Sequence, residues 1–155
     1  MPASKLKQFL DDHHIKYVSI MHSLAYTASE IAEAAHIHGR QLAKSVIVRL
    51  DGRLAMVVLP ASEKVDLKLL KAATRASDAA LADEREFDYK FPGCEPGAMP
   101  PFGTLYGMEV FAASTLADSG EIVFNAGSHT ELLRMSYKDF ENLVQPRIIN
   151  VSAAH

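Results

Sequence analysis

The sequence predicts an α+β protein, a single domain in which helices flank a mixed, mostly antiparallel β-sheet. Three observations predict this class. Amphipathic segments of helical period alternate with short β-branched and apolar runs. Two of those runs, residues 44–50 and 53–59, are joined by Asp51 and Gly52, a pair typical of a tight hairpin. The 155 residues can close one hydrophobic core and contain no repeat or low-complexity tract, so we expect one domain over residues 1–155.

The N-terminal part predicts a helix, a strand and a second helix. Residues 4–14 place apolar side chains at helical spacing behind a serine that can cap the first turn. Residues 17–21 have the composition of a strand. The segment from Thr27 to Glu30 is a capping box, and Gly39 is placed to end the helix that follows it.

The hairpin is the clearest local signal. Asp51 and Gly52 favour the left-handed dihedrals of a two-residue turn, and Pro60 closes the second strand. Residues 66–75 then predict a helix, with leucines available for burial and lysines for water.

The next stretch is less regular. Residues 79–90 fit a short strand followed by a helix. Residues 91–103 are rich in glycine and proline, a composition that excludes regular helix and central strand. Because this stretch also contains two phenylalanines and a methionine, we expect an ordered loop that packs against the domain.

The C-terminal third predicts strands at residues 108–111, 121–125 and 131–135. A helix over residues 136–144 and a last strand over residues 147–151 follow.

Composition restricts compartment and partners. Cys94 is the single cysteine, which excludes an intramolecular disulfide and a Cys-Cys metal site and favours the reducing cytosol. No apolar run approaches the roughly 18 residues needed to span a bilayer, so we expect a cytoplasmic protein without a membrane contact. The net charge is −3, so any contact with RNA should be small.

Three segments are candidates for chemistry. Lys44 opens an apolar strand, where it is either a solvated charge or a point charge suited to a phosphate or a developing oxyanion. In residues 97–101, glycine allows close backbone approach and prolines hold the turn rigid, although a packed turn has the same pattern. The turn at residues 125–129 adds backbone amides and an imidazole.

The seven histidines raise the question of a metal site. His36 and His38 are the best-spaced pair, but they lie at the predicted helix end, where their side chains diverge. We therefore expect surface or capping histidines, with no metal and no cofactor.

These segments together resemble the YbaK family of aminoacyl-tRNA deacylases, from about Leu6 to Val151. That family includes the editing domain inserted in bacterial prolyl-tRNA synthetases and the free-standing ProX-type proteins. The resemblance rests on the order and spacing of several pieces. They are His22, residues 27–32, 42–48, 58–60, 65–67 and 97–103, and the Asn-Ala-Gly-Ser-His turn at residues 125–129.

The resemblance implies a curved mixed sheet and a pocket for the terminal adenosine and the esterified amino acid of a mischarged tRNA. It implies catalytic roles for Lys44, Gly97 and Pro101, with no metal. It also implies a substrate-binding set, in which Met99, Phe102 and Ile47 are candidate walls of the amino-acid pocket. The remaining members of this set are His22, Thr27, Pro100, Gly127, Ser128 and His129.

The expected function is therefore hydrolysis of the ester at the tRNA 3′ end, with removal of a small residue such as Ala, Cys, Ser or Pro. An aminoacyl-tRNA synthetase is a candidate partner. A binding module of the same fold without catalysis, and a thiol hydrolase that uses Cys94, are the alternatives.

Overall fold

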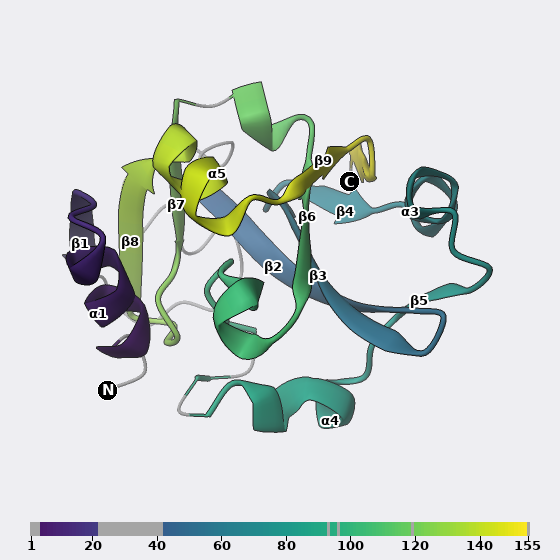
Figure 1. The fold of residues 1–155 in the computed structure, drawn as a ribbon, viewed down its shortest axis with the longest axis horizontal. Helices are drawn as coiled ribbons and strands as arrows, with labels where there is room; N and C mark the ends of the chain where they lie inside the picture. The colour runs from purple at the N-terminus through teal and green to yellow at the C-terminus, as the bar shows by residue number, and fades with distance from the viewer. Residues whose placement is uncertain (1–3, 22–41, 93, 96, 119, 155) are drawn as a thin grey trace.

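An eight-stranded mixed sheet forms the frame of the protein (Figure 1). The computed structural model describes residues 4–21, 42–92, 94–95, 97–118 and 120–154. The helices are α1 (Ser4–Asp12), α3 (Leu67–Thr74), α4 (Glu84–Phe87) and α5 (Tyr137–Val144), with 3₁₀ turns η1 (Asp88–Lys90), η2 (Gly103–Tyr106) and η3 (Leu116–Asp118). The strands are β1 (Tyr17–Met21), β2 (Leu42–Leu50), β3 (Arg53–Pro60), β4 (Glu63–Val65), β5 (Ala79–Leu81), β6 (Glu109–Ala113), β7 (Glu121–Asn125), β8 (Glu131–Ser136), β9 (Arg147–Ile149) and β10 (Ser152–Ala154).

The strand order is β1-β8-β7-β2-β3-β6-β9, with β5 also paired to β2. The pairs β1–β8, β7–β8, β2–β3 and β2–β5 are antiparallel, whereas β2–β7, β3–β6 and β6–β9 are parallel. Strands β4 and β10 form a separate antiparallel pair. The prediction of an α+β fold with a mixed sheet is confirmed.

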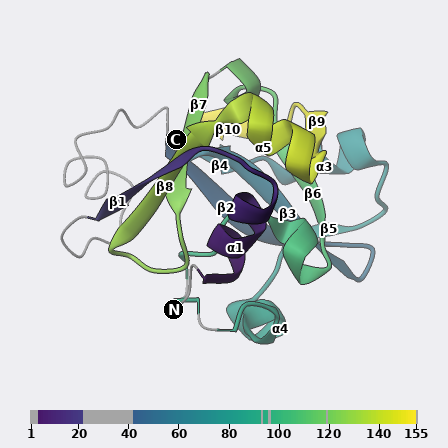
Figure 2. The ribbon, with the colours of Figure 1, turned by 60° about the vertical axis from the view of Figure 1, so that its left-hand side comes forward.

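Helices cover both faces of the sheet. The larger core contains Leu6 and Leu10 of α1 together with Phe140 of α5, and Figure 2 shows both helices in front of the strands. On the opposite face, Leu70 of α3 packs in a second cluster with Val48 of β2. Burial on both faces explains why β3 is almost continuously apolar in sequence.

The predicted hairpin is confirmed in its register and its turn. Leu50 pairs with Arg53, and the intervening Asp51 and Gly52 have φ values of 50° and 85°. Two positive φ angles define the turn whose twist matches the flanking strands. The Asp51 carboxylate also accepts the amide hydrogens of Ser77 and Asp78, which fixes the start of β5 beside the hairpin.

The helix ends also follow local sequence. Asp66 caps α3 by accepting from the amides of Lys68 and Leu69 at 2.9 and 3.1 Å. Ser136 caps α5 by accepting from the Asp139 amide. Because a capping side chain satisfies an amide that lacks a helical partner, each contributes about 1 kcal/mol.

Two predictions at the C-terminus differ from the structure. The predicted last strand ends at Ile149 instead of Val151, and the β4–β10 pair was not predicted. The chain leaves the main sheet because the Val151 carbonyl accepts from the Asp66 amide at 2.8 Å, after which β10 pairs with β4. This pairing joins residues far apart in sequence, so no local pattern indicates it.

The remaining predictions have mixed outcomes. Residues 91–103 form the expected packed loop between η1 and η2, with Phe91 and Phe102 buried. The predicted helix that begins at Thr27 and ends near Gly39 lies outside the described residues. Within the described ranges, no helix is long and apolar enough to cross a membrane.

Candidate active site

Strand β2 has one edge that is only partly paired. Along its other edge it pairs with β3 from Ala43 to Leu50. On the partly paired edge, β7 contacts only Leu42 and Ala43, and β5 contacts Val48 to Leu50. Residues 44–46 therefore have no strand beside them on this edge within the described residues, and we call this place the edge gap. Lys44, the residue singled out from sequence, lies at its start.

Lys44 is half-buried on the face of the sheet that packs against α3. Side chains two residues apart on a strand share a face, so Lys44 lies on the same side as Val46 and Val48, which pack in the second cluster. Burial lowers the pKa of Lys44, because removing water disfavours the ammonium, and the charge of Glu63 partly opposes this by raising the pKa. Lys44 is thus a single cation in weakly solvated surroundings.

The two glycine turns meet. The Glu95 amide donates to the Gly127 carbonyl at 2.8 Å, and the Gly127 amide donates to the Ala98 carbonyl at 2.9 Å. A third bond runs from the His129 amide to the Glu95 carboxylate at 3.1 Å. Gly97, at φ 80°, lies so close to His129 that an added Cβ would stand 3.7 Å from the ring Cε1. Loop 95–98 and turn 125–129 therefore form one unit.

Strand register brings this unit beside Lys44. Strand β7 runs parallel to β2 and pairs Phe124 with Ala43. This is the last pair of the ladder, so Lys44 on β2 and Asn125, the first residue of the turn, each follow directly after it. The lysine, the turn and the loop, which are far apart in sequence, thus come together at the edge gap.

Two buried oxygens at the edge gap were not singled out from sequence. The Oγ of Ser45 and the Oδ1 of Asn125 are buried and make no hydrogen bond within the described residues. A buried oxygen that lacks a donor costs roughly 1–3 kcal/mol. By strand alternation Ser45 points to the face opposite Lys44, so of the two oxygens that of Asn125 is better placed to accept from a ligand of Lys44. Both residues lie in segments that the resemblance covers, but residue type alone gave no reason to choose them.

The predicted pocket walls are placed unequally. Ile47 is three residues from Lys44 on one strand, so its side chain points to the opposite face, into the larger core. Phe102 is fully buried, with ring centroids 5.6–6.2 Å from those of Phe9, Phe124 and Phe140. Both side chains thus lie in the larger core, and their role as pocket walls stays a prediction.

The other predicted site residues lie in or near the loop unit. Met99, Pro100 and Pro101 are buried within the loop, and Met99 lines a small hollow with Cys94 and Glu95. Gly127, at φ 95°, and Ser128 belong to the turn. His129 is only 6 % exposed, which corrects the expectation of a surface histidine for this position. His22 and Thr27 lie outside the described residues.

The described residues give little support for a metal site or for a thiol nucleophile. The described residues contain no group of three His, Cys, Asp or Glu side chains that could hold a metal ion. Burial raises the pKa of the Cys94 thiol, whereas a nucleophilic cysteine needs a lowered pKa.

Comparison with known proteins identifies the family. The model of the aminoacyl-tRNA editing domain matches residues 22–143. This chain belongs to that family. The match includes Lys44, the loop 97–101 and the turn 125–129, so the editing domain contains all three segments of the candidate site.

Similar proteins agree with this assignment. In Escherichia coli, a protein named multifunctional Ser/Thr-tRNA deacylase ProXp-y is 29% identical over 115 residues, which cover 71% of this chain and 68% of the relative. A crystal structure of a candidate trans-editing enzyme for prolyl-tRNA synthetase matches with a TM-score of 0.83 at 19% identity and covers 99% of this chain and 98% of its own. A hypothetical protein of known structure matches with a TM-score of 0.86 at 18% identity, over 97% of this chain and 100% of its own. The two structures show the shared fold.

Proposed function

We propose that this editing domain hydrolyses the ester bond between a wrongly attached amino acid and the 3′ end of its tRNA. The observation that carries the proposal is the register of β2 and β7, which sets Lys44 beside the turn to which the Gly97 loop is hydrogen-bonded. Membership of the aminoacyl-tRNA editing family supports the same reaction. A non-catalytic binding module is less well supported, because the relative that matches over two thirds of its length is named as a deacylase.

The chemistry requires little from the protein. An aminoacyl ester is already activated, so hydrolysis needs a positioned nucleophile and stabilisation of the tetrahedral oxyanion. A half-buried cation acts more strongly on such a charge than an exposed one, because water screens it less. Lys44 then serves as an electrostatic anchor and not as a general base.

The loop supplies few backbone amides, which limits the candidate donors to the substrate carbonyl. Pro100 and Pro101 have no amide hydrogen, and the Ala98 amide already donates to the Glu95 carbonyl at 3.0 Å. Within residues 97–101, only the amides of Gly97 and Met99 are engaged by no other described residue. We propose these two amides as the donors to the substrate carbonyl, with Pro101 holding the loop rigid.

The nucleophile is a water molecule or the ribose hydroxyl of the substrate itself. The raised pKa of Cys94 argues against a thiolate in this role. Neither a metal nor a cofactor is part of the proposal.

The substrate is a small amino acid. One methylene changes binding by only about 1–3 kcal/mol, so an editing pocket works by excluding larger side chains. Of the three predicted walls, Met99 directly follows the loop 95–98 and lines a hollow with Glu95, so it is the one best placed to do this. We propose Ala, Cys, Ser or Pro as the residue removed, and the name of the E. coli relative adds Thr.

The proposal also covers the domain, the compartment and the partner of the reaction. Residues 1–155 act as one editing domain in the cytosol. The partner is the acceptor end of a tRNA, delivered freely or by an aminoacyl-tRNA synthetase.

Deacylation assays test this function. The purified chain is incubated with tRNAs charged with Ala, Cys, Ser, Thr or Pro, and the loss of the attached amino acid is followed against a blank without protein. We expect turnover of at least one of the five. Binding of these tRNAs without turnover of any would overturn the enzyme assignment in favour of the binding module.

A further inference from the structure

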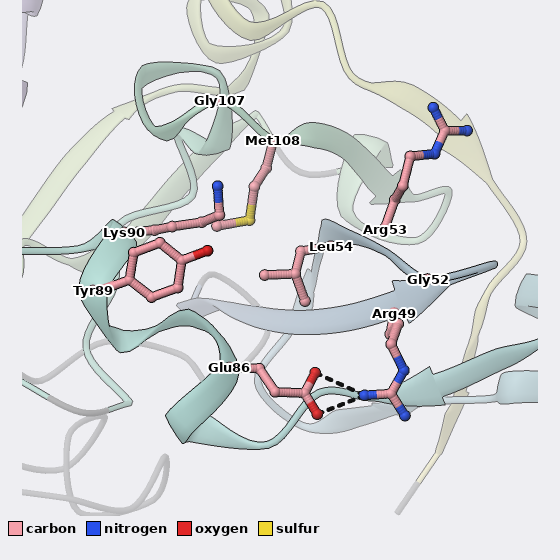
Figure 3. Close-up of a pocket in the computed structure, with 9 residues that line it drawn as sticks. All are labelled: Arg49, Gly52, Arg53, Leu54, Glu86, Tyr89, Lys90, Gly107 and Met108. Atoms are coloured by element: carbon pink, nitrogen blue, oxygen red, sulfur yellow. Dashed lines mark hydrogen bonds and ion pairs between the residues drawn. The ribbon is translucent and has the colours of Figure 1, made fainter.

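A second cationic site lies at the other end of β2, at the tip of the β2–β3 hairpin. Here a pocket of ≈ 450 Å³ opens between the hairpin, α4, η1 and the turn that precedes β6. Figure 3 shows Tyr89 and Lys90 on one side of it, Leu54 at its centre and Arg53 on the opposite rim.

The pocket has an excess of positive charge. Its lining contains Arg49, Arg53, Lys90 and one carboxylate, that of Glu86. Both Glu86 oxygens accept from Nη1 of Arg49, at 2.5 and 2.7 Å, so this pair is internally neutral. No carboxylate among the described residues forms an ion pair with Arg53 or Lys90, although Glu109 lines the adjoining hollow. Two unpaired cations in one pocket of a chain of net charge −3 indicate an anionic ligand.

An exposed aromatic ring lies beside these cations. Tyr89 is 70% exposed, and Nζ of Lys90 stands 5.5 Å from the centre of its ring. An exposed aromatic ring next to cations is the combination that binds a single-stranded nucleotide, with the base stacked on the ring and the phosphate held by the charge.

The position of the pocket relates it to the edge gap. Arg49 lies five positions after Lys44 on β2, a distance of about 16 Å along the strand. That span corresponds to roughly five stacked nucleotides, at about 3.4 Å each. By strand alternation Arg49 points to the face opposite Lys44, whereas Arg53, which pairs with Leu50, lies on the face of Lys44. A strand of RNA that contacts Lys44 can therefore follow this face to Arg53 at the hairpin tip.

We propose that the hairpin-tip pocket binds the RNA a few nucleotides away from the aminoacylated end, with Arg53 and Lys90 on backbone phosphates and Tyr89 stacked on a base. The identity of the ligand as the substrate tRNA rests on the proposed function. The pocket gives an acidic editing domain a small, local contact with RNA and requires no basic surface elsewhere.

The test compares two double variants of equal charge change. Arg53→Gln with Lys90→Gln removes the two unpaired cations, and Lys68→Gln with Lys71→Gln removes two exposed lysines of α3 as a control. Binding of uncharged tRNA is measured over a salt series, and KM and kcat are measured for the aminoacyl-tRNA that turns over. Circular dichroism confirms that both variants are folded.

We expect the pocket variant to raise the Kd for tRNA and the KM about tenfold or more and to reduce the salt slope of log K by about 1.4–1.8, with kcat retained. The control keeps the wild-type Kd. Tyr89→Ala weakens binding roughly tenfold while Tyr89→Phe does not, because the ring and not the hydroxyl is used.

Three results would overturn the proposal. The first is an unchanged Kd for tRNA in the pocket variant. The second is an equal loss of tRNA affinity in the α3 control. The third is binding of adenosine monophosphate that depends on Arg53 and Lys90 while tRNA binding does not depend on them. Failure of the proposed function is distinguishable, because uncharged tRNA binding is measured without turnover. A chain that lacks deacylase activity but loses tRNA binding in the pocket variant would support the pocket alone.

Discussion

Strand β2 carries a cationic site at each end, and the two differ in solvation. Lys44 is a single half-buried charge whose pKa is lowered by burial. At the hairpin tip, Arg49 is paired with Glu86, which raises its pKa, and Arg53 is exposed to solvent. A poorly solvated charge acts strongly on one nearby atom, whereas exposed charges attract phosphates through a field that salt screens. The comparison suggests chemistry at one end and binding at the other.

The largest expected effect is loss of turnover at the Lys44 end. Lys44→Ala should lower kcat by about 10²–10³-fold, the usual cost of removing a donor to an oxyanion. Lys68→Ala, which removes an exposed cation of α3, is the control and should keep the wild-type kcat. Single-turnover deacylation measures both, and circular dichroism verifies the fold. A wild-type rate in Lys44→Ala would remove the contrast between the two ends.

A matched pair of glycine variants sharpens the comparison next. Gly97 in the loop and Gly52 in the hairpin turn have φ values of 80° and 85°, so alanine is strained at both by about 1–2 kcal/mol. Both variants should lower the Tm by about 2–8 °C in thermal denaturation. Only Gly97→Ala should also lower kcat, by roughly tenfold or more, because it displaces the proposed donor amides. Equal kcat values in the two variants would argue against an active role for the loop.

The pH dependence gives a smaller effect with a definite sign. If the ammonium of Lys44 is required, kcat falls as pH rises through its pKa, which burial places below the ordinary 10.5. Glu63 raises that pKa, so Glu63→Gln should move the fall to lower pH. Glu109→Gln, an exposed carboxylate far from Lys44, should leave the profile in place. Rates are corrected for uncatalysed ester hydrolysis, and coincident profiles for all three proteins would exclude Glu63 from this role.

The smallest effect is expected for Cys94. Since burial raises the pKa of its thiol, Cys94→Ala should retain wild-type kcat and KM. Loss of activity in this variant, with its fold and Tm retained, would restore the thiol alternative.

Local signals predicted most of the fold. The Asp51-Gly52 turn, the helices predicted to begin at Asp66 and Ser136, and the apolar runs of the central strands were all assigned correctly, because each depends on neighbouring residues. The β4–β10 pair was missed because its partners are distant in sequence and only three residues long.

The site was predicted less completely, for a related reason. Lys44 and Gly97 were chosen through the resemblance and stay predictions until they are tested by mutation. Ile47 was predicted as a pocket wall from residue type, which does not show that alternation along β2 turns it to the face opposite Lys44, and its role stays untested. Ser45 and Asn125 were not chosen, because the burial of their oxygens depends on packing that residue type does not reveal.

The sequence by itself determined the class of fold, the order of its elements and the family to which they belong, because periodicity, caps and turns are local properties. The tertiary structure decided that the two glycine turns are hydrogen-bonded to each other and that β7 sets them beside Lys44. It also gathered Arg53, Tyr89 and Lys90 into one pocket. The physical reason is that strand register and loop contacts join residues far apart in the chain, and the geometry of those contacts exists only once the core is packed.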